Sequence, residues 1–415
     1  MVFSWNRILP WNVFKSRPDF FMTSPVTKPI RDRLAKTVVD LPRSGIRDFF
    51  DIVSQMKEVI SLGVGEPDFT TPWHIREGTM YSLEQGQTGY TSNLGMPKLR
   101  KAISGYVERT FGPSYHPDKE ILITVGVSEA LDLAVRALCN PGDEVIYHEP
   151  CYVSYRPLIT LAHAKPVILE TTAADNFRVT AERLRPLITE RTKLLILNFP
   201  NNPTGGGLGA ADVKGIAELA VEKDLIVITD EIYSELTYDR PHVSIAAMPG
   251  MRDRTIFLHG FSKALAMTGW RIGFSCAPPE LTEAMMKIHQ YTMLCAPVMS
   301  QEAAYQALRH PERDIQEMKE SYWRRRNFLH ASFVSMGLKC QKPEGAFYMF
   351  PEIRDLGISS KEFALKLLER EQVAAVPGTA FGACGEGHLR CCYATSMEQL
   401  QVAVRRIERF IGSLK

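Results

Sequence analysis

The sequence has 415 residues, enough for more than one domain around a large buried core. With 45% hydrophobic and 23% charged residues its composition is ordinary for a globular protein. The net charge of +2, without a dominant basic stripe, gives no reason to expect a nucleic-acid partner. No apolar run approaches the length that spans a bilayer, so we expect no membrane partner.

The first 21 residues carry tryptophans and phenylalanines among a few basic residues, without periodicity and without the apolar core of a secretory signal. We expect residues 1–30 to be a disordered N-terminal extension. We also expect the segment before Met22 to be dispensable, with Met22 as an alternative start.

Short apolar runs alternate with segments of helical period from about residue 121 onward. The runs predicted as strands are Ile121–Thr124, Glu144–Tyr147, Lys165–Leu169, Lys193–Asn198, Leu225–Thr229, Thr255–His259 and Ile272–Cys276. Between them, Glu129–Leu138 and Ala211–Glu222 have a helical period. Continuous apolar strands separated by helices predict an α/β fold, with a mainly parallel seven-stranded sheet covered on both faces.

The pattern changes after about residue 306, where long charged helices precede short strand-like segments and a final helix. This order predicts a second, smaller α+β domain. The densest basic run, Arg324 to Arg326, lies in one of these mixed-charge helices, and we interpret it as a solvated helix face.

The eight cysteines are scattered without a Cys-x-x-Cys pair. This spacing predicts reduced, mostly buried thiols in a cytoplasmic protein, and no metal site. Cys391 and Cys392 are adjacent in a strand-like segment, so their side chains should point to opposite faces.

Polar residues follow several predicted strands at their carboxyl ends, where ligands of parallel α/β sheets bind. Ser128, with the N–H groups of a helix start, would form an anion cradle, although a plain helix N-cap is the simpler alternative. Asn201 and Asn202 lie on a proline-containing turn and offer an amide to a ligand. Asp230 ends another strand close to Tyr233 and, when buried, needs a cationic partner to stay ionised.

Lys263 follows the next strand in an apolar stretch, Gly260–Arg271. Desolvation disfavours its ammonium form and makes the amine available as a nucleophile. A phosphate cradle, an amide, a carboxylate and an amine on one rim together fit pyridoxal 5′-phosphate (PLP). This cofactor binds a lysine through its aldehyde and needs an acidic partner for its pyridinium nitrogen.

Two other functional motifs are only partly matched. Gly126–Ala130 resembles the nucleophile elbow of hydrolases, but alanine replaces its last glycine. Gly205–Ala210 fits a dinucleotide-binding glycine pattern, but an Asn-Asn-Pro-Thr turn separates it from the preceding strand.

Four motifs occur together and in order, and the set resembles the class I aminotransferases of PLP fold type I. They are Ser61–Phe69, Asn201–Gly205, Asp230–Tyr233, and Ser262-Lys263 followed by Gly269-Trp270-Arg271. The resemblance runs from about residue 30 to the C-terminus. It implies a large PLP-binding domain of residues 76–305 and a small domain formed by residues 31–75 and 306–415.

The resemblance implies a role for each matching residue. Lys263 would be the Schiff-base lysine, Asp230 the partner of the pyridine nitrogen, and Tyr233 and Asn202 the donors to the ring oxygen. Tyr152 would stack on the ring, where the family often has tryptophan or phenylalanine. The implied phosphate contacts are Val127, Ser128, Ser262 and Arg271, together with Tyr90, which would reach the neighbouring subunit of a homodimer with shared active sites.

Arg390 matches the arginine that binds the substrate α-carboxylate, which a planar guanidinium can grip with two hydrogen bonds. Gly65 and Asn202 match further substrate contacts. The resemblance implies an aminotransferase that moves the amino group of an aromatic amino acid, aspartate or glutamate to a 2-oxo acid such as 2-oxoglutarate by a ping-pong mechanism. The residues of the segment Gly45–Phe50 support a resemblance to the aminotransferases that act on aromatic amino acids, aspartate and glutamate. β-Elimination or acyl-CoA condensation on the same lysine remains the alternative.

Overall fold

The computed structural model describes residues 29–42, 56 and 58–414. The expectations for residues 1–28 and for the Gly45–Phe50 motif lie outside this part of the chain. The chain divides into two units between Pro42 and Arg43. The described part of the first unit contains a 3-10 helix, Ile30–Arg33, and a short helix α1, Lys36–Val39.

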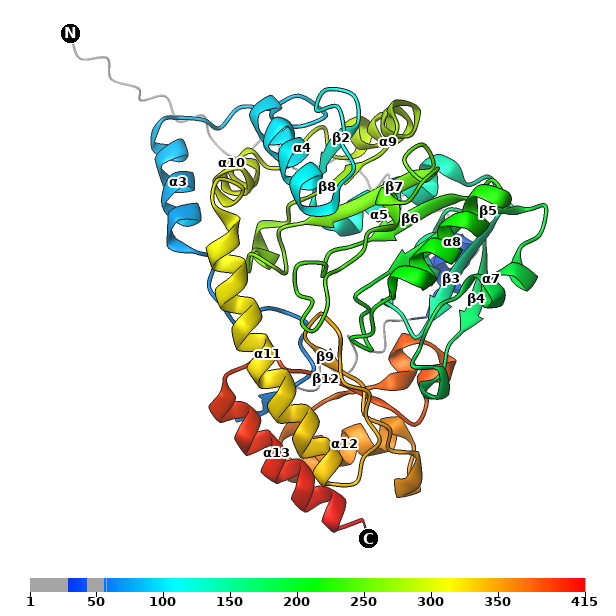
Figure 1. Cartoon of the computed structure of the whole chain (residues 1–415), viewed down its shortest axis with the longest axis vertical. Coiled ribbons are helices and arrows are strands. Elements are labelled where there is room, and N and C mark those ends of the chain that lie inside the picture. The colour runs from blue at the N-terminus through cyan, green and yellow to red at the C-terminus, as the bar shows by residue number, and fades with distance from the viewer. Residues whose placement is uncertain (1–28, 43–55, 57, 415) are drawn as a thin grey trace, which may run out of the picture. The chain divides into compact units, whose positions relative to one another are not determined.

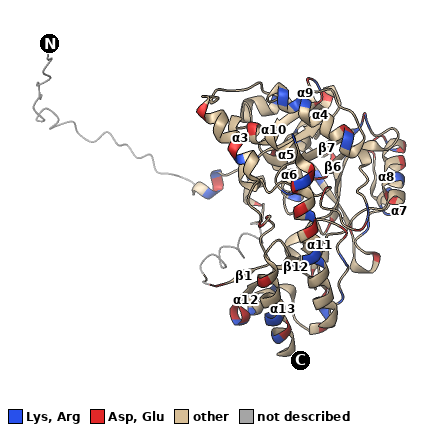
Figure 2. Cartoon of the chain, turned by 60° about the vertical axis from the view of Figure 1, so that its left-hand side comes forward, with Lys and Arg blue, Asp and Glu red and all other residues tan. Residues whose placement is uncertain are grey.

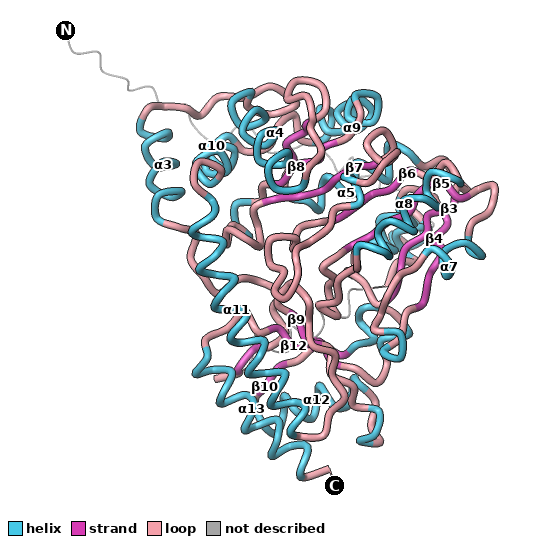
Figure 3. Tube along the Cα trace, in the orientation of Figure 1, coloured by secondary structure: helices cyan, strands magenta, loops and turns pink. Residues whose placement is uncertain are grey.

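A seven-stranded sheet forms the centre of the second unit, as predicted (Figure 1; Figure 3). Its strand order is β2-β8-β7-β6-β5-β3-β4. The strands are β2 (Ile121–Thr124), β3 (Glu144–Glu149), β4 (Lys165–Glu170), β5 (Thr192–Asn198), β6 (Ile226–Asp230), β7 (Thr255–Gly260) and β8 (Gly273–Cys276). Each lies within two residues of its predicted bounds.

The sheet is mainly parallel, with one exception. The pairs among β3 to β7 are parallel, whereas β8 runs antiparallel to both β7 and β2. Because the carboxyl ends of β5, β6 and β7 lie at the same edge, Asn198, Asp230 and Gly260 end the three strands side by side.

Helices cover both faces of this sheet, and the strand side chains alternate between them. Leu194 and Ile196 of β5 pack in a cluster with α5 (Gly126–Leu138), α6 (Tyr155–Leu161) and α9 (Pro279–Thr292). Leu195 and Leu197 point the other way, into a cluster with α7 (Ala181–Leu184) and α8 (Ala210–Glu222). Nearer β2 and β8, α4 (Pro97–Phe111) and α10 (Val298–Ala307) complete that second face, beside α3 (Trp73–Glu84).

Two small sheets lie next to the C-terminal helices. A parallel pair joins β1 (Ile60–Ser61) to β10 (Val373–Ala374), and an antiparallel sheet has the order β11-β12-β9. The strands of the antiparallel sheet are β9 (Tyr348–Met349), β11 (Val376–Pro377) and β12 (Leu389–Cys392). The C-terminal helices are α11 (Pro311–Ser335), α12 (Ser360–Glu371) and α13 (Met397–Gly412). The proposed division into a large and a small domain at residues 76 and 305 stays a prediction.

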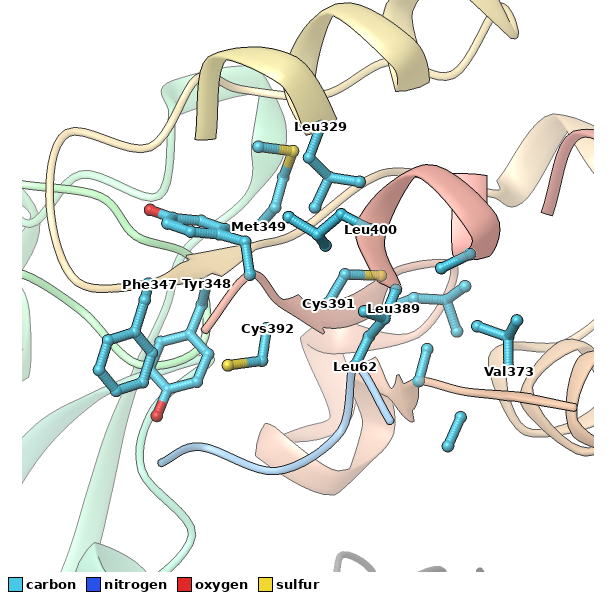
Figure 4. Packing of buried hydrophobic residues seen from close by; sticks show 14 of the residues in the cluster. Leu62, Leu329, Phe347, Tyr348, Met349, Val373, Leu389, Cys391, Cys392 and Leu400 are labelled. Atoms are coloured by element: carbon cyan, nitrogen blue, oxygen red, sulfur yellow. The ribbon is translucent and has the colours of Figure 1, made fainter. Parts of the chain in front are cut away.

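All eight cysteines are free; four are buried and four are half-buried. Figure 4 shows the Cys391 and Cys392 side chains on opposite sides of β12, with Cys391 toward Leu400 and Cys392 beside Tyr348. Among the described helices, none combines the length and the apolar composition that a membrane crossing requires.

The interpretation of Arg324–Arg326 as a solvated face is wrong for two of the three residues. Arg324 is exposed, but Arg325 and Arg326 are buried on α11, which carries charges of both signs (Figure 2). Arg326 is fully buried and binds both carboxylate oxygens of Asp239, and Arg325 binds Asp68 at 2.7 Å. Buried arginines require such partners, and these partners are far away in the sequence.

Candidate active site

A cavity of about 730 Å³ opens at the carboxyl ends of the central strands. Its lining includes all of the predicted site residues except Tyr90. These are Gly65, Val127, Ser128, Tyr152, Asn202, Asp230, Tyr233, Ser262, Lys263, Arg271 and Arg390. Residues from both ends of the second unit therefore meet the central sheet at one site.

Lys263 lies three residues after β7 and points into this cavity. Its Nζ donates a hydrogen bond to the carbonyl of Gly65 at 2.7 Å and lies near the rings of Tyr233 and Phe347. Burial lowers the pKa of Lys263 to about 8. The amine is therefore much more often neutral near physiological pH than a surface lysine would be.

Asp230 is buried at the end of β6, and burial raises the pKa of its carboxyl to about 6. Its Oδ2 accepts a hydrogen bond from Tyr155 at 2.8 Å, and its Oδ1 accepts one from the N–H of Ile232 at 3.4 Å. Within the described chain Asp230 forms no ion pair. The cationic partner expected from the sequence is therefore not found among the described residues, and hydrogen bonds from Tyr155 and Ile232 take its place.

The N-terminus of α5 and Arg271 form a positive corner of the cavity. Arg271 has a left-handed backbone (φ 50°), and its guanidinium lies against Gly126, where a Cβ would come within 2.6 Å of it. In the described part of the chain Arg271 pairs with no carboxylate; its Nη1 donates to the carbonyl of Thr268. Ser262 and the first turn of α5 line the same corner, which suits a phosphate group.

The simpler interpretation of Ser128 as a helix N-cap is wrong. Helix α5 begins at Gly126, so Ser128 lies inside its first turn, and no side chain caps the helix at Val125. Instead Glu129 accepts the Val125 N–H at 2.5 Å. Ser128 is thus left facing the cavity.

Arg390 is 3% exposed and lines the same cavity from β12. Its Nη1 donates to Asn202 Oδ1 at 3.0 Å and its Nη2 to the carbonyl of Gly63 at 2.5 Å. Its Nε is buried without a partner, and no carboxylate of the described residues pairs with it. A buried guanidinium in this state is suited to an anionic ligand.

Two tyrosines of the site were missed by the sequence analysis. Tyr155 donates to Asp230, and Tyr348 lines the cavity with its hydroxyl 2.9 Å from that of Tyr233. Tyr155 stands three residues after the predicted ring-stacking residue Tyr152, and the two rings meet edge to face at 5.7 Å between centroids. No local pattern distinguished Tyr155 or Tyr348 from a core tyrosine.

Tyr90 lies outside the cavity and is 86% exposed. Gly205, the first glycine of the dinucleotide pattern, packs against a backbone rather than at a helix start. A Cβ on Gly205 would come within 2.6 Å of the carbonyl oxygen of Tyr348, and α8 begins only at Ala210. This geometry argues against the nucleotide-binding alternative.

Comparison with known proteins identifies the family. The family profile described as aminotransferase class I and II matches residues 57–407. The chain is 52% identical to the putative aminotransferase YugH of Bacillus subtilis, over 91% of this chain and 98% of that protein, and 45% identical to an aspartate aminotransferase of Pyrococcus abyssi, over 90% and 96%.

The solved structure of an aromatic aminotransferase from Pyrococcus horikoshii OT3 superimposes with a TM-score of 0.84 at 42% identity, covering 89% of this chain and 99% of that one. The observed sheet is consistent with PLP fold type I. The chain therefore belongs to the class I and II aminotransferases, a family of PLP-dependent transferases.

Proposed function

We propose that this aminotransferase moves the amino group of an aromatic L-amino acid, aspartate or glutamate to 2-oxoglutarate, in two half-reactions at one site. The observation that carries the proposal is Arg390. It is a buried guanidinium with a free Nε and no carboxylate partner in the described chain, and it faces the same cavity as the Lys263 amine. A substrate α-carboxylate on Arg390 would bring its Cα near that amine.

The residues of the cavity fit PLP. Asp230 is a buried carboxylate without a cation of its own in the described chain, as a pyridinium partner should be. Arg271 and the start of α5 form an anion corner. When bound, PLP supplies an electron sink for the carbanion that forms at the substrate Cα.

The protein's own side chains would transfer the proton and hold the cofactor ring. Lys263 Nζ, partly neutral near pH 8, would act as nucleophile and then carry the proton away from the substrate Cα. Asn202 uses its Oδ1 on Arg390, which leaves its amide N–H groups to donate to a ring oxygen beside the Tyr233 hydroxyl. Tyr152 lines the cavity where a ring could stack.

The substrate range rests on the relatives and on the lining of the cavity. One relative is named an aspartate aminotransferase, and one structural neighbour is an aromatic aminotransferase. Apolar and aromatic residues, Val64, Val153 and Tyr348, line the same cavity as Arg390, which favours aromatic donors. A ping-pong order follows because donor and acceptor would use Arg390 in turn.

Absorbance spectra of the protein reconstituted with PLP test the proposal. We expect a yellow band that bleaches when tyrosine, phenylalanine or aspartate is added and returns with 2-oxoglutarate. Lys263→Ala should show neither the band nor turnover. Bleaching with release of pyruvate and ammonia, and no return with 2-oxoglutarate, would contradict the proposal.

We also propose a homodimer with shared active sites in the cytoplasm. The exposed Tyr90 supports the first point, because it lies outside the cavity of its own chain. The eight free cysteines support the second, since reduced thiols are typical of that compartment. Light scattering of the purified protein would test the dimer.

A further inference from the structure

Tyr348 contacts two of the proposed site residues, Tyr233 and Arg390, from one position on β9. The residue is 1% exposed, and its hydroxyl lies 2.9 Å from the hydroxyl of Tyr233. The guanidinium carbon of Arg390 lies 4.6 Å from the centre of its ring. It pairs with Cys392 of β12, two residues beyond Arg390, and Figure 4 shows it beside Phe347 and Cys392.

Tyr348 also limits the backbone that holds the lysine. A Cβ on Gly65 would collide with the Tyr348 hydroxyl, and the carbonyl of Gly65 is the acceptor of Lys263 Nζ. The backbone of Tyr348 is itself fixed by close packing against Gly205. The position of this tyrosine is therefore set independently of any ligand.

A buried tyrosine with only a packing role has different contacts. Tyr393, in the segment after β12, is equally buried, donates its hydroxyl to the carbonyl of Ala346 at 3.1 Å and does not line the cavity. The Tyr348 hydroxyl instead meets another side-chain hydroxyl inside the cavity. That hydroxyl belongs to Tyr233, the proposed donor to the cofactor ring oxygen.

We infer that Tyr348 is a positioning residue of the proposed transamination: its hydroxyl holds the Tyr233 hydroxyl, and its ring supports the Arg390 guanidinium. The inference rests on the proposed function, because it assigns Tyr233 to the cofactor and Arg390 to the substrate. The inference adds one side chain, Tyr348, that orients both Tyr233 and Arg390.

The hydroxyl pair has a defined chemical consequence. With PLP bound, Tyr233 would donate a hydrogen bond to the ring oxygen and its own oxygen would accept one from Tyr348; a donor chain of this kind polarises each hydrogen bond in it. Loss of the Tyr348 hydroxyl would weaken this donation, so the ring oxygen would become more basic and the pKa of the yellow chromophore would rise. The other titratable groups facing the pair are Asp230, Lys263, Arg390, Tyr152 and Cys392.

Tyr348→Phe and Tyr348→Leu separate the two contacts, with Tyr393→Phe as the matched control. All are studied as holoenzyme by pH titration of the yellow band and by steady-state kinetics. For Tyr348→Phe we expect the apparent pKa of the band to rise by roughly 0.2 to 1 pH unit, while KM for the amino donor stays within about twofold. For Tyr348→Leu, which also loses the ring, we expect the same band shift and a KM about 5- to 30-fold higher.

The control should leave both quantities unchanged. A Tyr348→Phe holoenzyme with wild-type circular dichroism and an unshifted band would overturn the inference, and this variant alone decides if the leucine variant fails to fold. Equal KM values for the phenylalanine and leucine variants would overturn the support of Arg390. A wild-type protein without a yellow band would instead overturn the proposed function, and the inference with it.

Discussion

The half-buried side chain of Lys263 should destabilise the folded apoenzyme in a pH-dependent way. The pKa of Lys263 is lowered by burial from 10.5 to about 8, so the unfolded chain binds this proton more tightly than the folded chain. Below pH 8 the folded state carries the charged amine at a cost. As the pH rises from 8 toward 10.5 that cost disappears, and the wild type gains stability relative to a Lys263→Met variant.

The size of the effect follows from the same pKa. At 1.36 kcal/mol per pH unit, full burial would make the relative gain roughly 2.5 kcal/mol between pH 7 and pH 10. Because the side chain is only half-buried and faces a cavity open to water, we expect about 1 to 2 kcal/mol. The hydrogen bond to Gly65 and the packing of methionine add an offset that does not change with pH.

Urea unfolding of both apoproteins, at one protein concentration and at several pH values from 7 to 10, measures this difference. Lys361→Met is the control, because Lys361 is exposed on α12 and its replacement should give a difference independent of pH. A Lys263→Met difference that stays as flat as the control would refute the reasoning.

Three further predictions concern the site. Arg390→Lys keeps the charge but loses the planar fork, so kcat/KM for amino donors should fall about 10- to 100-fold, whereas Arg324→Lys on the exposed side of α11 should not change it. Asp230→Asn should lower kcat/KM by about 10²- to 10³-fold in the same assay, because an amide cannot stabilise a protonated ring nitrogen; wild-type turnover would contradict that role. Mixing inactive Lys263→Ala subunits with Tyr90→Phe subunits should raise the activity above that of either variant alone, because one site of the mixed dimer then combines Lys263 of one subunit with Tyr90 of the other. No rise in activity would place Tyr90 outside the site of the neighbouring subunit.

The main sheet was predictable because its strands are continuous apolar runs with a polar residue at the end. That end marks the cavity, which is why Asp230, Lys263 and Asn202 could be selected from the sequence. A continuous apolar run does not indicate the direction of its strand, so the antiparallel orientation of β8 could not be predicted. The start of α5 was placed three residues late, because Gly126 and Val127 carry no helical period.

The remaining misses depend on partners distant in the sequence. The burial of Arg325 and Arg326 could not be predicted, because their carboxylate partners Asp68 and Asp239 are distant in the sequence. The hydroxyl of Tyr348 meets that of Tyr233, a residue more than a hundred positions away. Tertiary contacts of this kind decide which tyrosine is structural and which faces a ligand.

The position of β2 in the sheet has a consequence for biosynthesis. This strand is at the edge of the sheet and bonds only to β8, which follows it by roughly 150 residues. At 5 to 20 residues per second, a nascent chain displays the apolar β2 without its neighbour for about 8 to 30 s. Until β8 is made, both sides of β2 are open to other chains, and pairing with β8 closes one of them.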